Sequence, residues 1–227
     1  MPTATFENLP PVKRQAIIDI AIEEFGAHPY NAASVSRIVA RAGIAKGSVY
    51  QYFQDKQDFF LYLLAYATQA QLSLLGNLPP PDQPMDFFAT LRWQMSASVR
   101  VGVQAPQLVR LLRRAVEGNL PFQPEVERIL GRAGEEHFDR LLRAAQARGE
   151  IAPDLDLELA AYLVQRMTGE LGFFILRRLG LTPDDAVDDI AQLDTPAVEA
   201  IYDAVISILR SGLSAQDAPE TGLGGNV

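Results

Sequence analysis

A short run of polar side chains is the part of the sequence best suited to chemistry with another molecule. Lys46, Gly47, Ser48, Tyr50 and Gln51 lie close together in the chain. Cationic, hydroxyl and amide groups hydrogen-bond to base edges and to phosphate oxygens, and a glycine among them lets the backbone approach closely. The pattern therefore favours contact with nucleic acid over burial in a core.

Catalytic and metal-binding patterns do not stand out in the same way. The chain has no cysteine and only two histidines, His28 and His137, and it has no HExxH, P-loop or nucleophile-elbow motif. An acidic run within 184–189 lacks the glycine and the terminal glutamate of a calcium loop, so we interpret it as the solvated start of a helix. We expect no enzymatic activity, no metal and no cofactor.

Two short helices must position the polar run. Apolar residues recur at helical spacing over 34–41, Gly43 then offers a turn, and a second helix over 45–52 crosses the first. Two helices joined by a short turn with glycine form a helix-turn-helix. Val49 and Phe53, four residues apart, are the expected core anchors of the second helix.

The rest of the chain shows helical periodicity without an alternating strand pattern, so the predicted fold class is all-α. Asp55 is the expected cap of a long linking helix, which ends before the run Gly76–Pro81 because that run cannot be helical. The predicted helices span 12–26, 34–41, 45–52, 55–75, 85–104, 106–118, 124–148, 156–179, 183–191 and 196–210.

The charge of the chain is unevenly distributed. The net charge is −8, yet residues 1–60 hold six basic and six acidic groups, so the excess of acid lies after residue 60. An acidic body repels DNA and leaves only the N-terminal part to approach it. The longest apolar stretch, Phe59 to Ala67, is too short to span a bilayer, and no signal peptide is evident. We expect a cytoplasmic protein without a membrane partner.

The chain resembles the TetR family of one-component transcriptional regulators, most strongly over residues 13–64. The residues that carry the resemblance are Ala16, Ala21 and Phe25 of the first helix, Ala33-Ser34-Val35-Ser36-Arg37-Ile38, Ala42 through Phe53, and Asp55-Lys56-Gln57-Asp58-Phe59-Phe60. The pattern consists of a glycine, a hydroxyl residue and two tyrosines, followed by a phenylalanine and by an acidic residue next to a lysine. This combination is far more specific than a bare helix-turn-helix. Ala45 departs from the family, where a capping serine is frequent, and His28-Pro29 replaces a loop glycine.

The resemblance implies that the helix over 45–52 enters the major groove of a double-stranded DNA operator. It also implies that the N-termini of the helices over 34–41 and 55–75 grip the phosphate backbone. Tyr52 could equally be a core residue with its hydroxyl at the rim. The DNA-binding residues implied are Ser34, Ser36, Arg37, Ala45, Lys46, Gly47, Ser48, Tyr50, Gln51, Tyr52 and Lys56.

The breaks in the helical pattern predict a DNA-binding domain (1–54), a linking helix (55–76) and an effector-binding and dimerisation domain (77–213), in which the resemblance implies the effector pocket. The small, polar residues of the tail (214–227) predict disorder. A hydrophobic effector would bind in the larger domain, where our guess for the pocket is Phe88, Met95, His137, Met167 and Phe174. A hydrogen-bonded core histidine is the simpler interpretation of His137. The last two long helices, 157–179 and 196–210, are apolar enough to form a homodimer interface.

These observations favour a ligand-responsive regulator, most simply a repressor, that binds a palindromic operator as a dimer. Two alternatives stay open at this stage. One is a constitutive DNA-binding protein without an effector, and the other is an all-α small-molecule-binding bundle with an incidental helix-turn-helix.

Overall fold

The structure, a computed structural model, describes residues 2–79, 81, 84–181 and 193–213. Within these residues the chain is helical and has no strand, as the all-α prediction requires. The helices are α1 (Ala4–Glu7), α2 (Pro11–Ala27), α3 (Val35–Ala42), α4 (Lys46–Tyr52), α5 (Lys56–Gly76), α6 (Phe87–Gln104), α7 (Pro106–Glu117), α8 (Gln123–Ala147), α9 (Leu157–Leu179) and α11 (Pro196–Leu213). The predicted helix over 183–191 and the predicted disordered tail lie outside the described residues.

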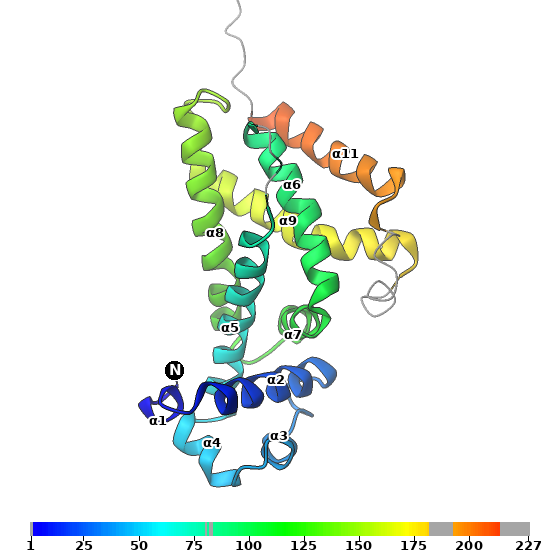
Figure 1. The fold of residues 1–227 in the computed structure, drawn as a ribbon. Coiled ribbons are helices and arrows are strands. Elements are labelled where there is room, and N and C mark those ends of the chain that lie inside the picture. Colours follow the sequence, from blue (N-terminus) through cyan, green and yellow to red (C-terminus); the bar gives the residue numbers. More distant parts are fainter. Residues whose placement is uncertain (1, 80, 82–83, 182–192, 214–227) are drawn as a thin grey trace, which may run out of the picture.

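Helices α1 to α4 form an N-terminal head at one end of the molecule, with α3 and α4 at its outer surface (Figure 1). The helix-turn-helix forms as predicted. Ser34 caps α3 by accepting a hydrogen bond from the backbone N–H of Arg37, and Gly43 ends it in the left-handed conformation with φ of 64°. A residue with a side chain is strained at that φ, so glycine is what lets α4 turn away from α3.

Helix α5 runs from the head into the larger C-terminal half (Figure 1). The Asp55 carboxylate caps it by accepting from the backbone N–H of Asp58. By length and composition α5 is also apolar enough to cross a membrane. Several of its apolar side chains are buried inside the protein, among them Phe59, Phe60 and Leu63.

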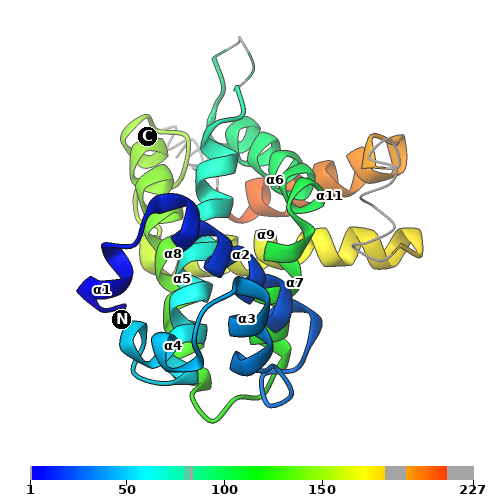
Figure 2. The ribbon, with the colours of Figure 1, turned by 60° about the horizontal axis from the view of Figure 1, so that its bottom comes forward.

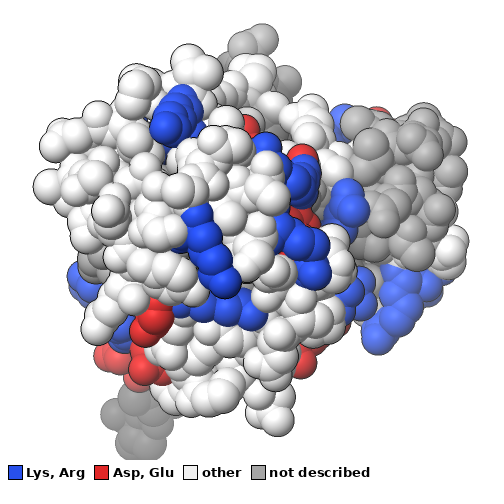
Figure 3. All heavy atoms as spheres, turned by 90° about the horizontal axis from the view of Figure 1, so that it is seen from below, with Lys and Arg blue, Asp and Glu red and all other residues white. Residues whose placement is uncertain are grey.

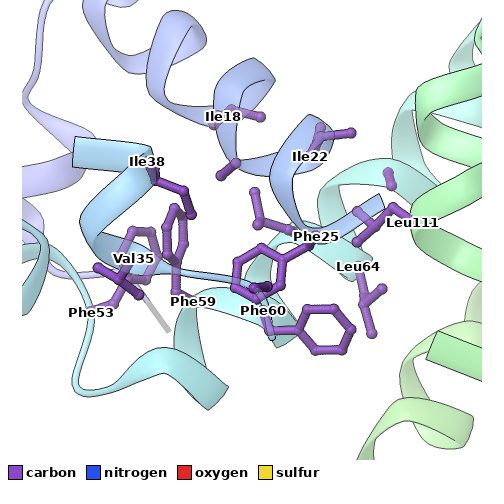
Figure 4. Close-up of a cluster of buried hydrophobic side chains, with 14 of the residues drawn as sticks. Ile18, Ile22, Phe25, Val35, Ile38, Phe53, Phe59, Phe60, Leu64 and Leu111 are labelled. Carbon is purple, nitrogen blue, oxygen red and sulfur yellow. The ribbon is translucent and has the colours of Figure 1, made fainter. Parts of the chain in front are cut away.

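The head does not close its core by itself. Figure 4 shows Ile22 and Phe25 of α2, Ile38 of α3 and Phe60 of α5 converging on one cluster, with Leu111 of α7 at its edge. Helix α7 packs along α2, so an element from the C-terminal half completes the core of the head (Figure 2). The apolar periodicity of α2 predicted its buried face, but not that a helix some 80 residues later would cover it.

The C-terminal half has a second core, formed by α6, α8, α9 and α11. Leu142 of α8, Ile175 of α9 and Tyr202 of α11 are completely or almost completely buried there. Arg92 of α6 donates to the carboxylates of Asp203 and Glu199 at 2.7 and 2.6 Å, which ties α11 to α6. Burial, with the nearby charge of Glu199, raises the pKa of Tyr202 to about 12, so its hydroxyl stays protonated.

Helix α1 is a single helical turn at the N-terminus that the apolar spacing of the sequence did not predict. Phe6 of α1 is fully buried, and its ring centroid lies 5.5 Å from that of Tyr52, 4.8 Å from Phe53 and 5.6 Å from Tyr62. Thr3 adds two hydrogen bonds, from its backbone N–H to the carbonyl of Tyr52 and from its hydroxyl to that of Gln51. Residues 3–6 therefore fasten the C-terminal end of α4.

Candidate nucleic-acid interface

Helix α4 presents polar side chains to solvent. Lys46, Tyr50 and Gln51 are exposed, and Ser48 is partly exposed. Lys46 makes no hydrogen bond or ion pair with any residue that the structure describes, and the Tyr50 side chain is 52% exposed. Val49 is buried on the opposite face, and Phe53 is buried just beyond the helix, as predicted for the two core anchors. The helix is therefore held from within and leaves its outer face free to contact a ligand.

Gly47 has no structural role that the fold explains. Its φ is not in the left-handed region, and a Cβ built on it would meet no atom within 4 Å. Glycine near the start of a helix costs stability relative to alanine, because glycine loses more conformational freedom on folding. An open glycine on an exposed helix face suits a position where another molecule approaches the backbone.

The surface around α3 and α4 is mostly uncharged, and Lys and Arg side chains cross its middle (Figure 3). Ala45 precedes α4 in an extended conformation and offers no side-chain cap. The first backbone N–H groups of α4 consequently lack a side-chain acceptor, and such groups bind anions. Ser36 is exposed in the first turn of α3 and adds a hydroxyl donor.

A buried carboxylate organises the start of α3. Glu24 of α2 is 4% exposed and accepts hydrogen bonds from the backbone N–H of Ser34 at 2.8 Å and from the guanidinium of Arg37 at 2.5 to 3.2 Å. Arg37 also donates to the carbonyl of Ala32 at 2.8 Å. The resemblance implies that Arg37 contacts the phosphate backbone of DNA. In the structure most of the N–H groups of its guanidinium donate to groups within the protein.

The electrostatics of Glu24 follow from these contacts. Burial by itself would raise the pKa of its carboxyl, but the hydrogen bonds from Arg37 and Ser34 and the charges of Arg37 and His28 hold that pKa below its usual value. Glu24 is therefore ionised when the protein is folded at neutral pH. Nothing in the spacing of the sequence singles it out, because its partners lie 10 and 13 residues away.

Lys56, at the first position of α5, is also engaged within the protein. Its ammonium donates to the carbonyl of Tyr30 and lies 4.6 Å from the centre of the Tyr30 ring. Burial lowers the pKa of Lys56, and the charge of Glu24 opposes that shift. These contacts tie the start of α5 to the loop before α3, and the DNA contact implied for Lys56 stays a prediction.

Tyr52 is 6% exposed and packs against Phe6, so most of its side chain belongs to the core. Sequence reasoning placed it between the core and the DNA-binding surface, because a tyrosine at helical spacing serves either role. The residues that the structure brings together on the outer surface of the head are Ser36, Lys46, Gly47, Ser48, Tyr50 and Gln51.

A second candidate site is a cavity of about 1030 Å³ among α5, α6, α7, α8 and α9. Met95, His137 and Phe174 line it, as guessed from the sequence. Phe88 does not, because it is buried against Phe87 near the start of α6, with the guanidinium of Arg210 4.4 Å from its ring.

The structure also shows the surroundings of the other two residues that were guessed for the pocket, Met167 and His137. Met167 does not line the cavity and packs against the second core. The Nε2 atom of His137 lies 3.1 Å from Oε1 of Gln94, and burial together with the charge of Arg140 lowers the pKa of the imidazole. His137 thus has the hydrogen-bonded environment of the simpler interpretation and also borders the cavity.

Comparisons with known proteins agree with this geometry. Residues 17–63 match the family described as bacterial regulatory proteins, tetR family. The transcriptional regulator AcuR of Cereibacter sphaeroides is 30% identical over 178 residues, which are 75% of this chain and 78% of the relative. A TetR family regulator from Chloroflexus aurantiacus has a solved structure with 34% identity and a TM-score of 0.69, covering 95% of this chain and all of that one. The chain belongs to the TetR family.

The TetR family assignment makes this protein a DNA-binding transcriptional regulator, and it confirms that the chain is not an enzyme. The fold extends to more distant members. The regulator FadR of Bacillus subtilis, solved in complex with stearoyl-CoA, is 21% identical with a TM-score of 0.64 over 87% of this chain and 98% of its own.

Proposed function

We propose that this TetR-family protein is a ligand-responsive repressor that binds a palindromic operator as a homodimer in the cytoplasm and releases it when a small apolar effector binds. The observation that carries the DNA-binding role is the outer face of α4. It combines a lysine that has no ion pair within the described residues, an open glycine and an exposed tyrosine on a helix whose other face is buried. A helix of this kind fits the major groove, where lysine can reach guanine and the glycine lets the backbone come near.

Exposed apolar side chains support the homodimer. Leu159, Tyr162 and Leu163 follow one another at helical spacing on α9, and each is close to half exposed. Ile208 of α11 is also exposed. A second copy that covers both helices would remove this apolar surface from water and place two heads side by side. Two-fold symmetry would then suit an operator with half-sites about 34–36 Å apart.

The cavity supports the proposal that the protein binds an effector. Two of the helices that line it, α5 and α7, also contribute to the core of the head, so they connect the two sites. Val109 and Leu112 of α7 line the cavity, while Leu108 and Leu111 of the same helix are buried in the core of the head. Helix α5 likewise lines the cavity and enters that core. A ligand that prefers one position of α5 and α7 would therefore shift the spacing of the two heads, and it would release DNA if that spacing does not fit the operator. The stearoyl-CoA bound by FadR, which shares the fold, supports an apolar effector.

Selection of bound duplexes from a random DNA pool tests this function. We expect an enriched palindrome with half-sites about one helical turn apart, and two protein chains per duplex in sedimentation velocity. The apolar-effector part predicts that compounds that stabilise the protein thermally also lower its affinity for the selected duplex. A pool without an enriched motif would overturn the DNA-binding role, and one chain per duplex would overturn the dimer.

A further inference from the structure

Arg37 uses only part of its hydrogen-bonding capacity inside the protein. Its Nε donates to the two carboxylate oxygens of Glu24 at 3.0 and 3.2 Å, and its Nη2 donates to Oε1 of Glu24 and to the carbonyl of Ala32. Three of the five N–H groups of the guanidinium are occupied in this way. The other two, on Nη1, make no hydrogen bond with any residue that the structure describes, and half of the Arg37 side chain is exposed. One edge of the guanidinium therefore stays free to bind a group from outside the protein.

Glu24 fixes the direction in which this free edge points. Its carboxylate is 4% exposed and is itself held by the backbone N–H of Ser34, which donates to Oε1 at 2.8 Å. Parallel hydrogen bonds between a carboxylate and a planar guanidinium leave the guanidinium little freedom to rotate. A flexible arginine loses conformational freedom when it binds a ligand, whereas Arg37 has already lost that freedom on folding. Binding through Nη1 is therefore less costly for Arg37 than for an arginine that moves freely in solvent.

The free edge lies where a phosphate group is favoured. Arg37 is in the first turn of α3, directly after Ser36, which is exposed. The start of a helix carries a partial positive charge that favours anions, and a guanidinium donates strongly to phosphate oxygens. The same end of the molecule presents the outer face of α4, and Lys and Arg side chains cross its surface (Figure 3). A phosphate group can therefore bind Nη1 without breaking the ion pair with Glu24.

We infer that Glu24 is a positioning residue for DNA binding: it holds Arg37 so that Nη1 donates to a phosphate oxygen of the operator. The inference rests on the proposed function for the operator itself. Two simpler accounts predict different results. A purely structural ion pair would stabilise the protein without changing the affinity of the folded protein for DNA. Repulsion between the Glu24 carboxylate and the DNA phosphates would make removal of the acid strengthen binding.

The variant Glu24→Gln separates these accounts in anisotropy titrations with the duplex enriched from the random pool. Glutamine keeps an oxygen for the N–H of Ser34, but it offers an NH2 group where Arg37 needs an acceptor, so the guanidinium is released. We expect operator affinity to fall by about 2- to 10-fold for each bound head, the range that ordering one long side chain supplies. The titrations are made at a temperature at which circular dichroism shows the variant to be folded.

A variant of Arg37 shows whether Glu24 acts through it. Arg37→Gln still donates to the Glu24 carboxylate and so avoids an unpaired buried charge, but it lacks Nη1. We expect Arg37→Gln to lower operator affinity by about tenfold or more for each head. The slope of log affinity against log salt concentration should become shallower by about 0.9 for each head. In the Arg37→Gln background, Glu24→Gln should cause no further loss.

The matched control is Glu23→Gln. Glu23 is on the same helix, is 54% exposed and pairs with Arg41 in the last turn of α3, so this variant removes an equal charge without releasing Arg37. Its operator affinity should equal or slightly exceed that of the wild type. The inference is overturned if Glu24→Gln binds the operator as tightly as the wild type or more tightly, if Glu23→Gln loses affinity to the same extent, or if the loss in Glu24→Gln persists in the Arg37→Gln background.

The same titrations separate this inference from the proposed function. If the wild type binds the enriched duplex and Glu24→Gln binds it equally well, only the positioning role fails. If the wild type binds no duplex, the proposed function fails and the inference fails with it.

Discussion

Replacement of Gly47 by alanine should strengthen the fold and weaken DNA binding at the same time. A Cβ at this position meets nothing within 4 Å, so the new methyl group adds no clash inside the protein. Alanine in a helix is favoured over glycine by about 0.5–1 kcal/mol, which for a chain of this size raises the melting temperature by about 1–4 °C. A substitution with this sign cannot lose function by unfolding the head.

On DNA the same methyl group would stand where the backbone of α4 approaches the bases. An added methylene in a well-packed contact costs about 1–3 kcal/mol, which corresponds to a loss of affinity of about 5- to 150-fold. Fluorescence anisotropy with the selected operator measures the loss, and calorimetry measures the melting temperature. Gly212→Ala is the control, because Gly212 is equally open but lies near the end of α11, far from the head (Figure 1). Unchanged operator affinity in Gly47→Ala, with the melting temperature raised, would refute the placement of this face on DNA.

Three further predictions follow from the head and from the dimer surface. Phe6→Ala should lower the free energy of unfolding by about 3–5 kcal/mol and also reduce operator affinity where the variant is still folded, unlike Leu142→Ala in the second core. The pKa of Glu24 is lower in the folded chain, so its carboxylate stabilises the protein above its unfolded pKa, and that stability is lost as the pH falls from about 5. Glu24→Gln should flatten this part of the pH profile in urea titrations. Leu163→Arg should shift sedimentation from dimer to monomer.

Each of these predictions has an outcome that contradicts it. Equal operator affinities for Phe6→Ala and Leu142→Ala, at conditions where both are folded, would remove the role of α1 in positioning α4. An acid limb of the stability profile that is identical in Glu24→Gln and the wild type would show that Glu24 does not contribute to it. A dimer that persists in Leu163→Arg at micromolar concentration would place the interface elsewhere.

The helix-turn-helix could be predicted from the sequence because its determinants are local. Ser34 as a cap, Gly43 in the left-handed turn and the apolar spacing of Val49 and Phe53 all act within a few residues. The roles of Arg37 and Lys56 were not predictable in this way. Both are cations at helix starts, and each is engaged by a group brought close only by the fold, the carboxylate of Glu24 and the carbonyl of Tyr30.

The cavity shows the same limit. Helical periodicity predicted that the apolar residues of α6, α8 and α9 are buried. It could not predict whether a buried side chain faces a core or a cavity. Met95 and Phe88 are both buried on α6, and only Met95 lines the cavity. The α7 contribution to the head was missed for a related reason, since its buried face at Leu108 and Leu111 identifies no partner helix by itself.

The most direct test of the DNA-binding surface is the operator affinity of Lys46→Ala compared with that of Arg132→Ala. Both variants remove one positive charge from an exposed side chain, but Lys46 lies on the outer face of α4, whereas Arg132 pairs with Glu136 on α8. Anisotropy titrations at several salt concentrations should show near wild-type binding for Arg132→Ala and a loss of about tenfold or more for Lys46→Ala. Equal affinities for the two variants would contradict the assignment of α4 as the helix that binds DNA.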